Sequence, residues 1–586
     1  MVPCPPVAMA SVEVPTAPRT PSWRERLLLG PFFAVVAAAM ALPAPWQWNT
    51  RVAGDNGDAV FNLWVMNWVG SHVTSWATLW RGQIFQPNDL VLAYSDIVLP
   101  QSLVFRAFDT VLSDAAAFNL TSLLAWILSL WLCFALLRRL TGSTAGSLVA
   151  SLAWNFAACR LGHVWHFQLV TAGFVIPLCL LAYFRLIERP TILRGVLLGL
   201  SLAISVLAAS YYGAMMAVGI AILVAVELVG DRRLPRRSVV CSLLAAAAVA
   251  GVLLGPVYLQ YQRLGRDPHF ERTAEPDFST TARDLLVPAS TTRVLDDVPV
   301  LDGFEARNVE RQAFTGALIS AAAAVGLVVL VRRRRVTRDV LGVVVLGGVM
   351  LLLSSGSRGW LVGLDVPAPF AVLRRIVPPL SGIRAVSRFV VVFELAVALL
   401  GAIGISALLR RLQGAGWRFL AVGIAVLVVL LETAIEVPTV RLPTEARWTA
   451  VNRALREEPE GLTVELPIVS STGGVAWPYV EAPREFLATV DGQPRVNGYS
   501  GFEPPRFSEL TAALNRFPED DAIAVMRDLG VRYVVVRTSM VGNFEPEVRS
   551  LLRSLIPRFD EGAAVREARF HPRHIGDAWL FDLTKP

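Results

Sequence analysis

The sequence predicts a polytopic α-helical membrane protein, with about 11 transmembrane helices, that carries an α/β domain at its C-terminal end. Of its 586 residues, 54% are apolar and only 17% are charged, against about 25% charged residues in soluble proteins. The positive mean hydropathy, +0.52, comes from long apolar runs. Each run has about 20 residues, the length that crosses a hydrocarbon core of about 30 Å. The composition therefore excludes a soluble enzyme as the class of the whole chain.

The N-terminal residues 1–25 are expected to be a disordered cytoplasmic tail, because the segment up to Pro21 is rich in proline. Arg24 and Arg26 then precede an apolar run that is too long for the core of a cleaved signal peptide. We therefore expect an uncleaved signal anchor.

Residues 26–436 are expected to form the transmembrane domain. Eleven apolar runs are long enough to cross a membrane. They cover residues 27–46, 117–137, 143–160, 165–184, 194–210, 211–230, 238–258, 313–331, 339–355, 389–409 and 419–436.

Arginine supplies nearly all of the positive charge, since only one of the 54 basic residues is a lysine, Lys585. The arginines concentrate in alternate connections between the runs, around residues 138–139, 185–194, 232–237, 332–338 and 410–418. Short cytoplasmic loops are rich in basic residues. The pattern therefore predicts a multi-pass protein of the cell membrane with a cytoplasmic N-terminus and an extracytoplasmic C-terminal domain.

Three long loops, 47–116, 259–312 and 356–388, then lie outside the cytoplasm. The first contains two apolar runs, 59–76 and 97–112, of which the earlier is rich in tryptophan. Tryptophan at this density favours helices that lie in the membrane interface, although both runs could instead cross together.

Residues 437–586 have the composition of a soluble domain. Its expected strands are Leu462–Leu466, Val531–Arg537 and Trp579–Leu583, and its expected helices are Trp448–Glu457, Phe507–Phe517 and Asp521–Leu529. This mixture is typical of a small α/β or α+β domain.

Several chemistries find no support in the sequence. The five cysteines show no metal-ligand spacing, and neither a Walker A loop, a dinucleotide fingerprint nor a Gly-x-Ser-x-Gly elbow occurs. We therefore expect neither a nucleotide-driven transporter nor a lipase, and no nucleic-acid partner.

Two carboxylates, Asp55 and Asp58, stand in the turn Gly54-Asp55-Asn56-Gly57-Asp58 shortly after the first span. At an outer membrane surface, such a base can take the proton of an acceptor hydroxyl while a lipid-linked donor lies in the bilayer. The alternative is an ordinary solvated Asx turn. Asp96 opens the next apolar run and is a weaker candidate, since it can also be a helix N-cap.

The turn between the third and fourth runs contains Arg160, His163, His166 and Gln168. Arginine and histidine at the interface can bind a phosphate, and the two histidines can share a helical face or ligate a metal. Snorkelling by Arg160 and solvated histidines are the alternative.

Basic residues also precede the run at 389, on the predicted outer side and against the charge bias: Arg374, Arg375, Arg384 and Arg388. They favour a bound phosphate or anionic headgroup. Docking to the acidic loop 296–305 or to the C-terminal domain is the alternative.

In the C-terminal domain, the loop Asn497–Pro505 combines an amide, Tyr499 and Phe502 with two glycines. Aromatic rings and polar groups in one loop suit contact with carbohydrate, although structural packing explains the same residues.

Together these features resemble the GT-C superfamily of membrane glycosyltransferases, and more narrowly a poorly characterised bacterial branch of it. The similarity covers about residues 30–540. It rests on the motifs Gly54–Asp58, Phe61-Asn62, Ala93–Asp96, Arg160–Gln168, Tyr211–Gly213, Ile383-Arg384, Ser387–Phe389 and Asn497–Gly501.

The resemblance implies a cell-envelope enzyme that transfers a sugar, with inversion, from a polyprenyl-phosphate donor to an extracytoplasmic glycan, lipid or protein. The superfamily's catalytic aspartate falls on Asp58 or Asp55, and Asp58 is preferred because it directly precedes the interfacial run. Asn56 and Gly57 separate the two carboxylates, unlike the adjacent acidic pair of many members, which leaves the choice open. Substrate binding is expected from Asp96, Arg160, His163, His166, Gln168, Arg384, Arg388, Asn497 and Tyr499.

Some relatives bind a divalent cation, Mg²⁺ or Mn²⁺, and others do not, so the resemblance leaves the metal open. Two other functions also remain. A non-catalytic flippase or exporter of lipid-linked saccharide is disfavoured by the scarcity of charges within the runs. A scaffold whose C-terminal domain binds glycan is the third possibility.

Overall fold

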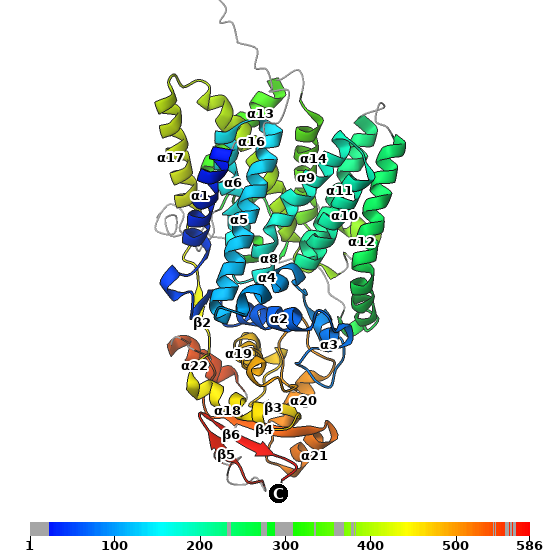
Figure 1. Ribbon diagram of the computed structural model, residues 1–586, viewed down its shortest axis with the longest axis vertical. Coiled ribbons are helices and arrows are strands. Elements are labelled where there is room, and N and C mark those ends of the chain that lie inside the picture. Colours follow the sequence, from blue (N-terminus) through cyan, green and yellow to red (C-terminus); the bar gives the residue numbers. More distant parts are fainter. Residues whose placement is uncertain are drawn as a thin grey trace, which may run out of the picture.

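The computed structural model describes residues 23–230, 236–270, 278–287, 309–332, 336–356, 369–376, 380, 382–542, 544, 546–556, 562, 565 and 570–585. These residues form two stacked parts: a bundle of long helices and a smaller C-terminal domain of strands and helices (Figure 1). The acidic loop 296–305, residues 1–22 and Pro378 and Pro379 lie outside the described residues.

The bundle confirms a helical polytopic protein, since each of the eleven apolar runs contains a helix. Its helices are α1 (Trp23–Ala41), α5 (Asp114–Thr141), α6 (Thr144–Asn155), α9 (Val175–Glu188), α10 (Ile192–Ala208), α11 (Ser210–Gly230), α12 (Arg236–Leu264), α13 (Ala317–Arg332), α14 (Arg338–Ser354), α16 (Val390–Leu409) and α17 (Ala415–Thr433).

Within the described residues, six helical stretches are long and apolar enough to cross a membrane. They are Asp114–Thr141, Phe167–Glu188, Ser210–Leu228, Arg236–Leu264, Val386–Leu409 and Ala415–Thr433, and three shorter apolar helices accompany them. Residues 143–160 depart from the expected uniform helix. The 12 residues of α6 reach only about 18 Å, and the short helices α7 (Ala158–Leu161) and α8 (Phe167–Thr171) follow.

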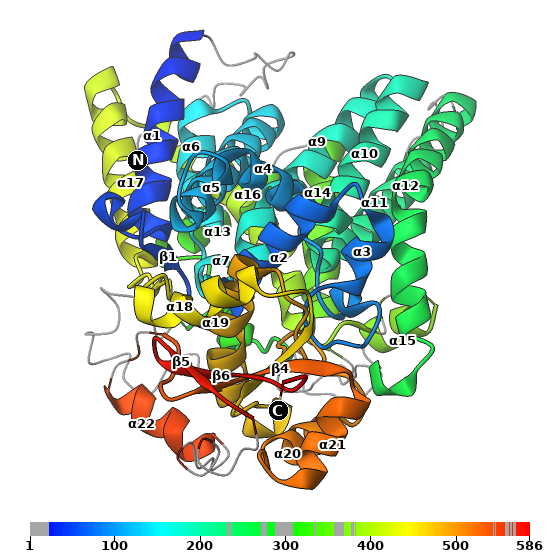
Figure 2. The same cartoon turned by 60° about the horizontal axis from the view of Figure 1, so that its bottom comes forward.

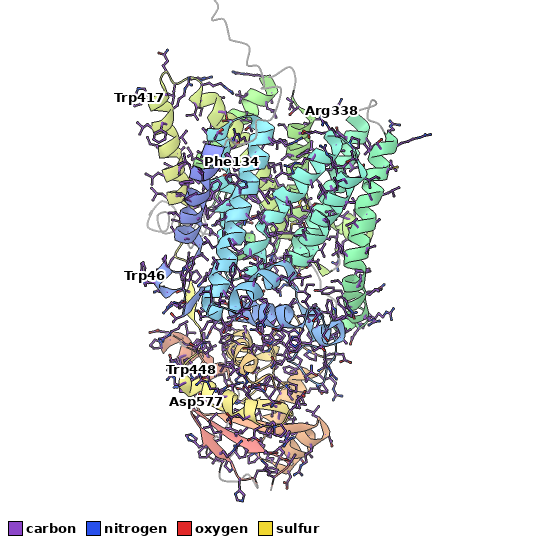
Figure 3. All side chains as sticks on the ribbon, in the orientation of Figure 1. Trp46, Phe134, Arg338, Trp417, Trp448 and Asp577 are labelled. Carbon is purple, nitrogen blue, oxygen red and sulfur yellow. The ribbon has the colours of Figure 1, made fainter. Side chains whose placement is uncertain are left out.

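Within the described residues, the helix ends that border the arginine-rich connections lie at one end of the bundle (Figure 1). Arg139 pairs with Glu188 at the end of α9 and with Asp339 at the start of α14, at 2.6 and 2.8 Å. Figure 3 shows Arg338 and Trp417 at the end opposite the C-terminal domain, in which Trp448 and Asp577 lie. The alternation read from the arginines therefore corresponds to a real separation of two ends.

Small residues let helices α13 and α16 approach closely, as is common in membrane helix pairs. A side-chain carbon at Gly404 would overlap the backbone carbonyl oxygen of Ala322, and one at Gly326 would overlap that of Leu400. The contact is therefore made backbone against backbone.

Three short helices from the first long loop lie at the junction of the two parts: α2 (Asp58–His72), α3 (Trp76–Arg81) and α4 (Leu99–Asp109). Figures 1 and 2 show α2 lying between the bundle and the C-terminal domain, with α19 (Ala476–Asp491) beside it. Most of α2 is buried, from Ala59 to Met66 and at Val69. Its apolar run therefore packs within the protein.

The C-terminal domain is a four-stranded sheet with helices, as expected for a mixed α/β domain. The strands are β3 (Leu462–Leu466), β4 (Val531–Arg537), β5 (Arg573–Ile575) and β6 (Ala578–Asp582), in the order β3-β4-β6-β5. Strands β3 and β4 are parallel, and the other pairs are antiparallel. The helices are α18 (Ala446–Glu457), α19, α20 (Phe507–Leu514), α21 (Asp520–Asp528) and α22 (Pro546–Leu555).

Two backbone ladders tie the domain to the first long loop. Strand β1 (Arg51–Ala53) pairs antiparallel with β2 (Thr439–Arg441), the strand that leads into the domain. Farther along the loop, the Arg495 N–H donates to the Gln83 carbonyl at 2.7 Å, and the Gln86 N–H donates to the Arg495 carbonyl at 2.8 Å. The residues between these two ladders, which include the acidic turn, are therefore held against the C-terminal domain.

Candidate functional site

The acidic turn begins where β1 ends. The Gly54 N–H donates to the Pro438 carbonyl at 2.8 Å, and Gly54 has a φ of +116°, a conformation that favours glycine. Asp55 then accepts the Gly57 N–H through Oδ1 at 3.1 Å, which closes an Asx turn. Asp58 is the first residue of α2, where the partial positive charge of the helix end favours a carboxylate.

Two tyrosines of the C-terminal domain donate hydrogen bonds to these carboxylates. The Tyr479 hydroxyl lies 3.3 Å from Asp55 Oδ2, and the Tyr499 hydroxyl lies 2.5 Å from Asp58 Oδ1. Burial and the neighbouring Asp58 raise the pKa of Tyr499, so this hydroxyl keeps its proton and acts as a donor. The two alternatives therefore describe the same structure, since the Asx turn holds both carboxylates in place.

The two carboxylates lie in different surroundings. Burial, and next the charge of Asp58, raise the pKa of Asp55 to about 6, although the Ala59 and Gly57 N–H groups and the Tyr479 hydroxyl lower it. Asp55 therefore changes its charge close to neutral pH. Carboxyls with such shifted values cluster at functional sites.

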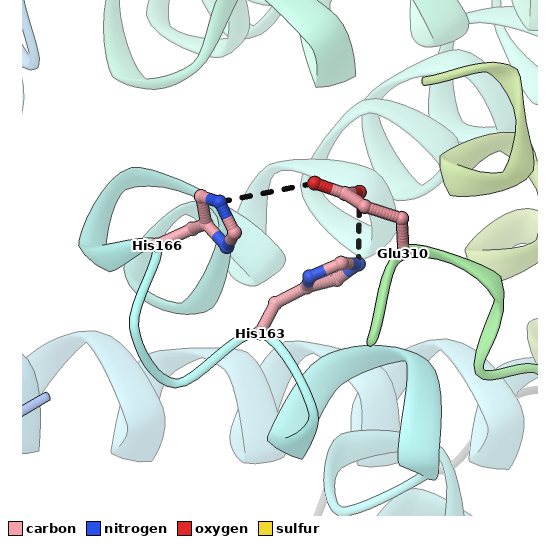
Figure 4. Close-up of side chains that lie close together, drawn as sticks. All are labelled: His163, His166 and Glu310. Atoms are coloured by element: carbon pink, nitrogen blue, oxygen red, sulfur yellow. Dashed lines mark ion pairs between the residues drawn. The ribbon is translucent and has the colours of Figure 1, made fainter. Parts of the chain in front are cut away.

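A row of ionisable side chains leads from Asp58 into the bundle. His166 Nε2 lies 3.5 Å from Asp58 Oδ2 and 3.8 Å from Glu310 Oε1, and His163 Nε2 lies 3.8 Å from Glu310 Oε2. Figure 4 shows both imidazoles pointing toward the Glu310 carboxylate. Glu310 in turn accepts two hydrogen bonds from Arg388, one from Nη2 at 2.7 Å and one from Nε at 2.9 Å.

The charges in this row are fixed by the local environment. Burial lowers the pKa of His163 to about 3, against the opposing effect of Glu310, so the imidazole is neutral at physiological pH. Burial alone would raise the pKa of Glu310, but the charge and hydrogen bonds of Arg388 lower it overall, so the carboxylate stays ionised. The guanidinium of Arg388 also lies over the Tyr211 ring, 4.6 Å from its centroid.

His163, His166 and Glu310 also form a possible metal-binding group, since their ligand atoms all lie within 4.8 Å of one another. Two imidazoles and a carboxylate suit Mn²⁺ or Zn²⁺, whereas Mg²⁺ prefers oxygen ligands. Both oxygens of Glu310, however, already accept hydrogen bonds from Arg388. A metal ion bound there would share this carboxylate with the guanidinium of Arg388.

Other predicted site residues adjoin this row. The Asn62 amide, on α2, donates to Gln168 Oε1 at 3.4 Å. Arg384 lies near the start of α16 with its guanidinium 5.1 Å from the centroid of the Phe278 ring, and its backbone N–H donates to the Tyr211 hydroxyl at 3.2 Å. The structure therefore brings Asp55, Asp58, His163, His166, Gln168, Arg384, Arg388 and Tyr499 to one junction.

The remaining predicted residues have different surroundings. Arg160 is buried in the bundle, stacked between Trp126 and Trp154 and hydrogen-bonded to Asn155 and Ser129. These contacts are those of a buried structural arginine and contradict interface snorkelling.

Asp96 and Asn497 also have structural contacts. The carboxylate of Asp96 accepts the N–H of Ser210 at 3.0 Å, so it contacts the start of α11. Asn497 is buried in the C-terminal domain, where its amide bonds the backbone of Glu465 and the carboxylate of Glu481. Tyr499, two residues later, is the part of this loop that reaches the acidic turn.

Sequence reasoning missed Glu310 and Tyr479. Glu310 stands three residues before an apolar run, and an acidic residue next to a predicted span was a usable signal. Tyr479 had none, because the segment containing Pro478 and Pro483 does not read as a helix, although it forms α19.

Comparison with known proteins places the chain as follows. A family model described as a domain of unknown function (DUF6311) matches residues 24–432. No curated protein matches the chain. Among solved structures, the archaeal oligosaccharyltransferase AglB from Archaeoglobus fulgidus, in complex with an inhibitory peptide and a dolichol-phosphate, is similar over 88% of this chain and 70% of its own. Its sequence identity is 14% and its TM-score 0.44.

ArnT from Cupriavidus metallidurans is similar as well. Its structure bound to undecaprenyl phosphate has 12% identity and a TM-score of 0.47 over 96% of this chain and 98% of its own. Its apo structure has 13% identity and a TM-score of 0.37 over 95% and 96%. Each of these similarities extends over most of this chain.

Proposed function

The chain belongs to the DUF6311 family, and we propose that it is a membrane glycosyltransferase that uses a polyprenyl-phosphate-linked sugar as donor. The acceptor is an extracytoplasmic glycan, lipid or protein. The observation that carries the proposal is the row from Asp58 through His166 and Glu310 to Arg388. This row joins the Asp58 carboxylate at the junction to the buried guanidinium of Arg388. Sugar transfer from a lipid phosphate needs one group of each charge: a base for the acceptor and a cation for the phosphate.

In this mechanism Asp58 is the general base. It accepts the proton of the acceptor hydroxyl while the acceptor oxygen bonds to the anomeric carbon from the face opposite the phosphate. The bond from that carbon to the phosphate oxygen breaks, and its electron pair leaves with the lipid phosphate. Arg388 and Arg384 lie on the side that receives this negative charge, and the neutral His163 adds a polar wall without a competing charge.

Asp58 is preferred over Asp55 as the base because of what each contacts. Asp55 bonds the backbone of its own turn and Tyr479. Asp58 faces His166 and, through it, the row that leads to Arg388. Asp55 then supports the turn, and its charge adds to the field at Asp58.

The proposed topology follows the two separated ends of the bundle. Eleven crossings would place the arginine-rich end and residues 1–25 in the cytoplasm, and the transmembrane domain 26–436 would be followed by the extracytoplasmic domain 437–586. Arg139 with its partners Glu188 and Asp339 supports this arrangement, because these residues meet at the end away from the acidic turn. The acidic turn then lies at the outer surface, where a lipid phosphate and an extracytoplasmic acceptor can meet.

No step is assigned to a metal ion. Arg388 neutralises the carboxylate that a cation at His163 and His166 would need.

The proposal is tested by transfer of radiolabelled sugar from synthetic undecaprenyl-phosphate hexoses to acceptors in the host's own membranes. The full-length protein in nanodiscs is compared with Asp58→Asn and with Asp89→Asn. Asp89 belongs to the same loop, but its side chain is 82% exposed. Asp58→Asn should abolish transfer and Asp89→Asn should leave it unchanged, whereas full activity in both Asp55→Asn and Asp58→Asn would overturn the proposal.

A further inference from the structure

The C-terminal domain covers the whole acidic turn. Tyr479 bonds Asp55 and Tyr499 bonds Asp58. A side-chain carbon at Gly57 would lie only 2.9 Å from Pro478 Cβ, and one at Gly542 would lie 2.5 Å from the Asn56 amide nitrogen. All four residues from 55 to 58 therefore lie directly against this domain.

We propose that Tyr499 and Tyr479 are positioning residues of the transfer site, so that the site is complete only when the C-terminal domain is docked on α2. This inference rests on the proposed function, because it assigns a role in the same reaction. It adds that residues from two separate parts of the chain must cooperate in one catalytic step.

The side chain of Tyr499 is held in one orientation by its neighbours. Its ring packs edge-on against Phe61 of α2 and Trp477 of α19, with centroids 5.3 and 5.0 Å away. Its backbone N–H donates to the buried carboxylate of Glu485, also on α19. These contacts hold the phenol ring in place independently of its hydrogen bond to Asp58.

This fixed donor orients the Asp58 carboxylate. With Oδ1 bonded to Tyr499 at 2.5 Å and Oδ2 facing His166 at 3.5 Å, rotation of the carboxylate would break a contact on either side. A carboxylate has about four acceptor sites, so lone pairs remain for a proton from the acceptor. A base held in one orientation accelerates the reaction more than a mobile base does, because the reacting atoms must be aligned.

Tyr479 acts on the other carboxylate. The groups that face Asp55 are Asp58, the N–H groups of Gly57 and Ala59, and the Tyr479 hydroxyl. The Tyr479 hydrogen bond favours the charged form of Asp55. Its loss should therefore shift the protonation of Asp55 toward higher pH.

The test compares Tyr499→Phe with Tyr533→Phe in the full-length protein in nanodiscs, with undecaprenyl-phosphate hexose as donor. Tyr533 is a matched control, since its buried hydroxyl donates to the Pro459 carbonyl at 2.9 Å within the same domain. Losing a hydrogen bond to a charged group corresponds to about 10- to 100-fold, so Tyr499→Phe should lower kcat at least tenfold with KM for the donor little changed.

Tyr479→Phe supplies an independent readout that a purely structural role would not move. It should shift the acid limb of the pH–rate profile to higher pH, and it also serves if Tyr499→Phe does not fold. One set of results overturns this inference alone. In it the wild type is active and Asp58→Asn is inactive, but Tyr499→Phe has the same kcat as Tyr533→Phe and Tyr479→Phe does not shift the pH–rate profile. A wild type that transfers no sugar from any donor of the panel overturns the proposed function, and this inference with it.

Discussion

Replacing Glu310 by glutamine tests the ionic row without any knowledge of the substrate. The carboxylate accepts two hydrogen bonds from Arg388, at 2.7 and 2.9 Å, and the two side chains are only 9% and 8% exposed. Solvent therefore screens this pair little. In Glu310→Gln the guanidinium stays buried without its counter-charge.

The magnitude follows from the cost of leaving one charge of a buried pair alone. Removing one partner of such a pair costs about 3–5 kcal/mol. Glutamine keeps one acceptor oxygen, so a loss of about 2–4 kcal/mol in the free energy of unfolding is expected, and a larger one for Glu310→Ala.

The assay is unfolding of the purified full-length protein in detergent, followed by tryptophan fluorescence during heating and during titration with a denaturing detergent. Glu509→Gln is the control, because the Arg506–Glu509 pair is 82% and 64% exposed and should contribute nothing measurable. If Glu310→Gln unfolds together with Glu509→Gln and the wild type, the row is not the structural unit described above.

Three further outcomes are expected. Because burial and Asp58 raise the pKa of Asp55 to about 6, its ionised fraction falls about tenfold between pH 7 and pH 5. The transfer rate should fall over the same range, by at most that factor, because Asp58 then loses the support of the neighbouring charge. A flat profile over this range would contradict a role for the Asp55 charge. Gly404→Ala should lower the unfolding temperature because its methyl group meets the α13 backbone, whereas Gly423→Ala, with open space around it, should not. Excess EDTA should leave transfer unchanged because Arg388 already balances Glu310; loss of activity that added Mn²⁺ restores would show that a metal takes part.

Much of the architecture was predictable because two strong signals act over long segments. Apolar runs located each long helix, and the strands Leu462–Leu466 and Val531–Arg537 were found at their observed bounds. The predicted helix bounds were wrong for one apolar run that contains a charged residue. The apolar run at 143–160 predicts a single span, but the helix ends at Asn155, and Arg160 hydrogen-bonds to Asn155 inside the bundle.

The candidate site was only partly predictable, because sequence motifs do not reveal which distant residues meet. The acidic turn, the histidines and Arg388 each stood out by residue type and position. Their assembly depends on Glu310 and Tyr479, which lie more than 200 residues from the acidic turn along the chain, and Tyr479 carries no local signature. Arg388 illustrates the difference: from sequence it is an outward cation in need of an anion, and in the structure that anion is Glu310.

The most direct measurement is a structure of the full-length protein in nanodiscs with undecaprenyl phosphate bound. The proposed mechanism predicts that the phosphate lies at the junction of α2 and the bundle, within hydrogen-bonding reach of Arg384 or Arg388 and on the same side as Asp58. A phosphate at the arginine-rich end near Arg338, or in a position from which the acidic turn cannot reach the donor sugar, would contradict it.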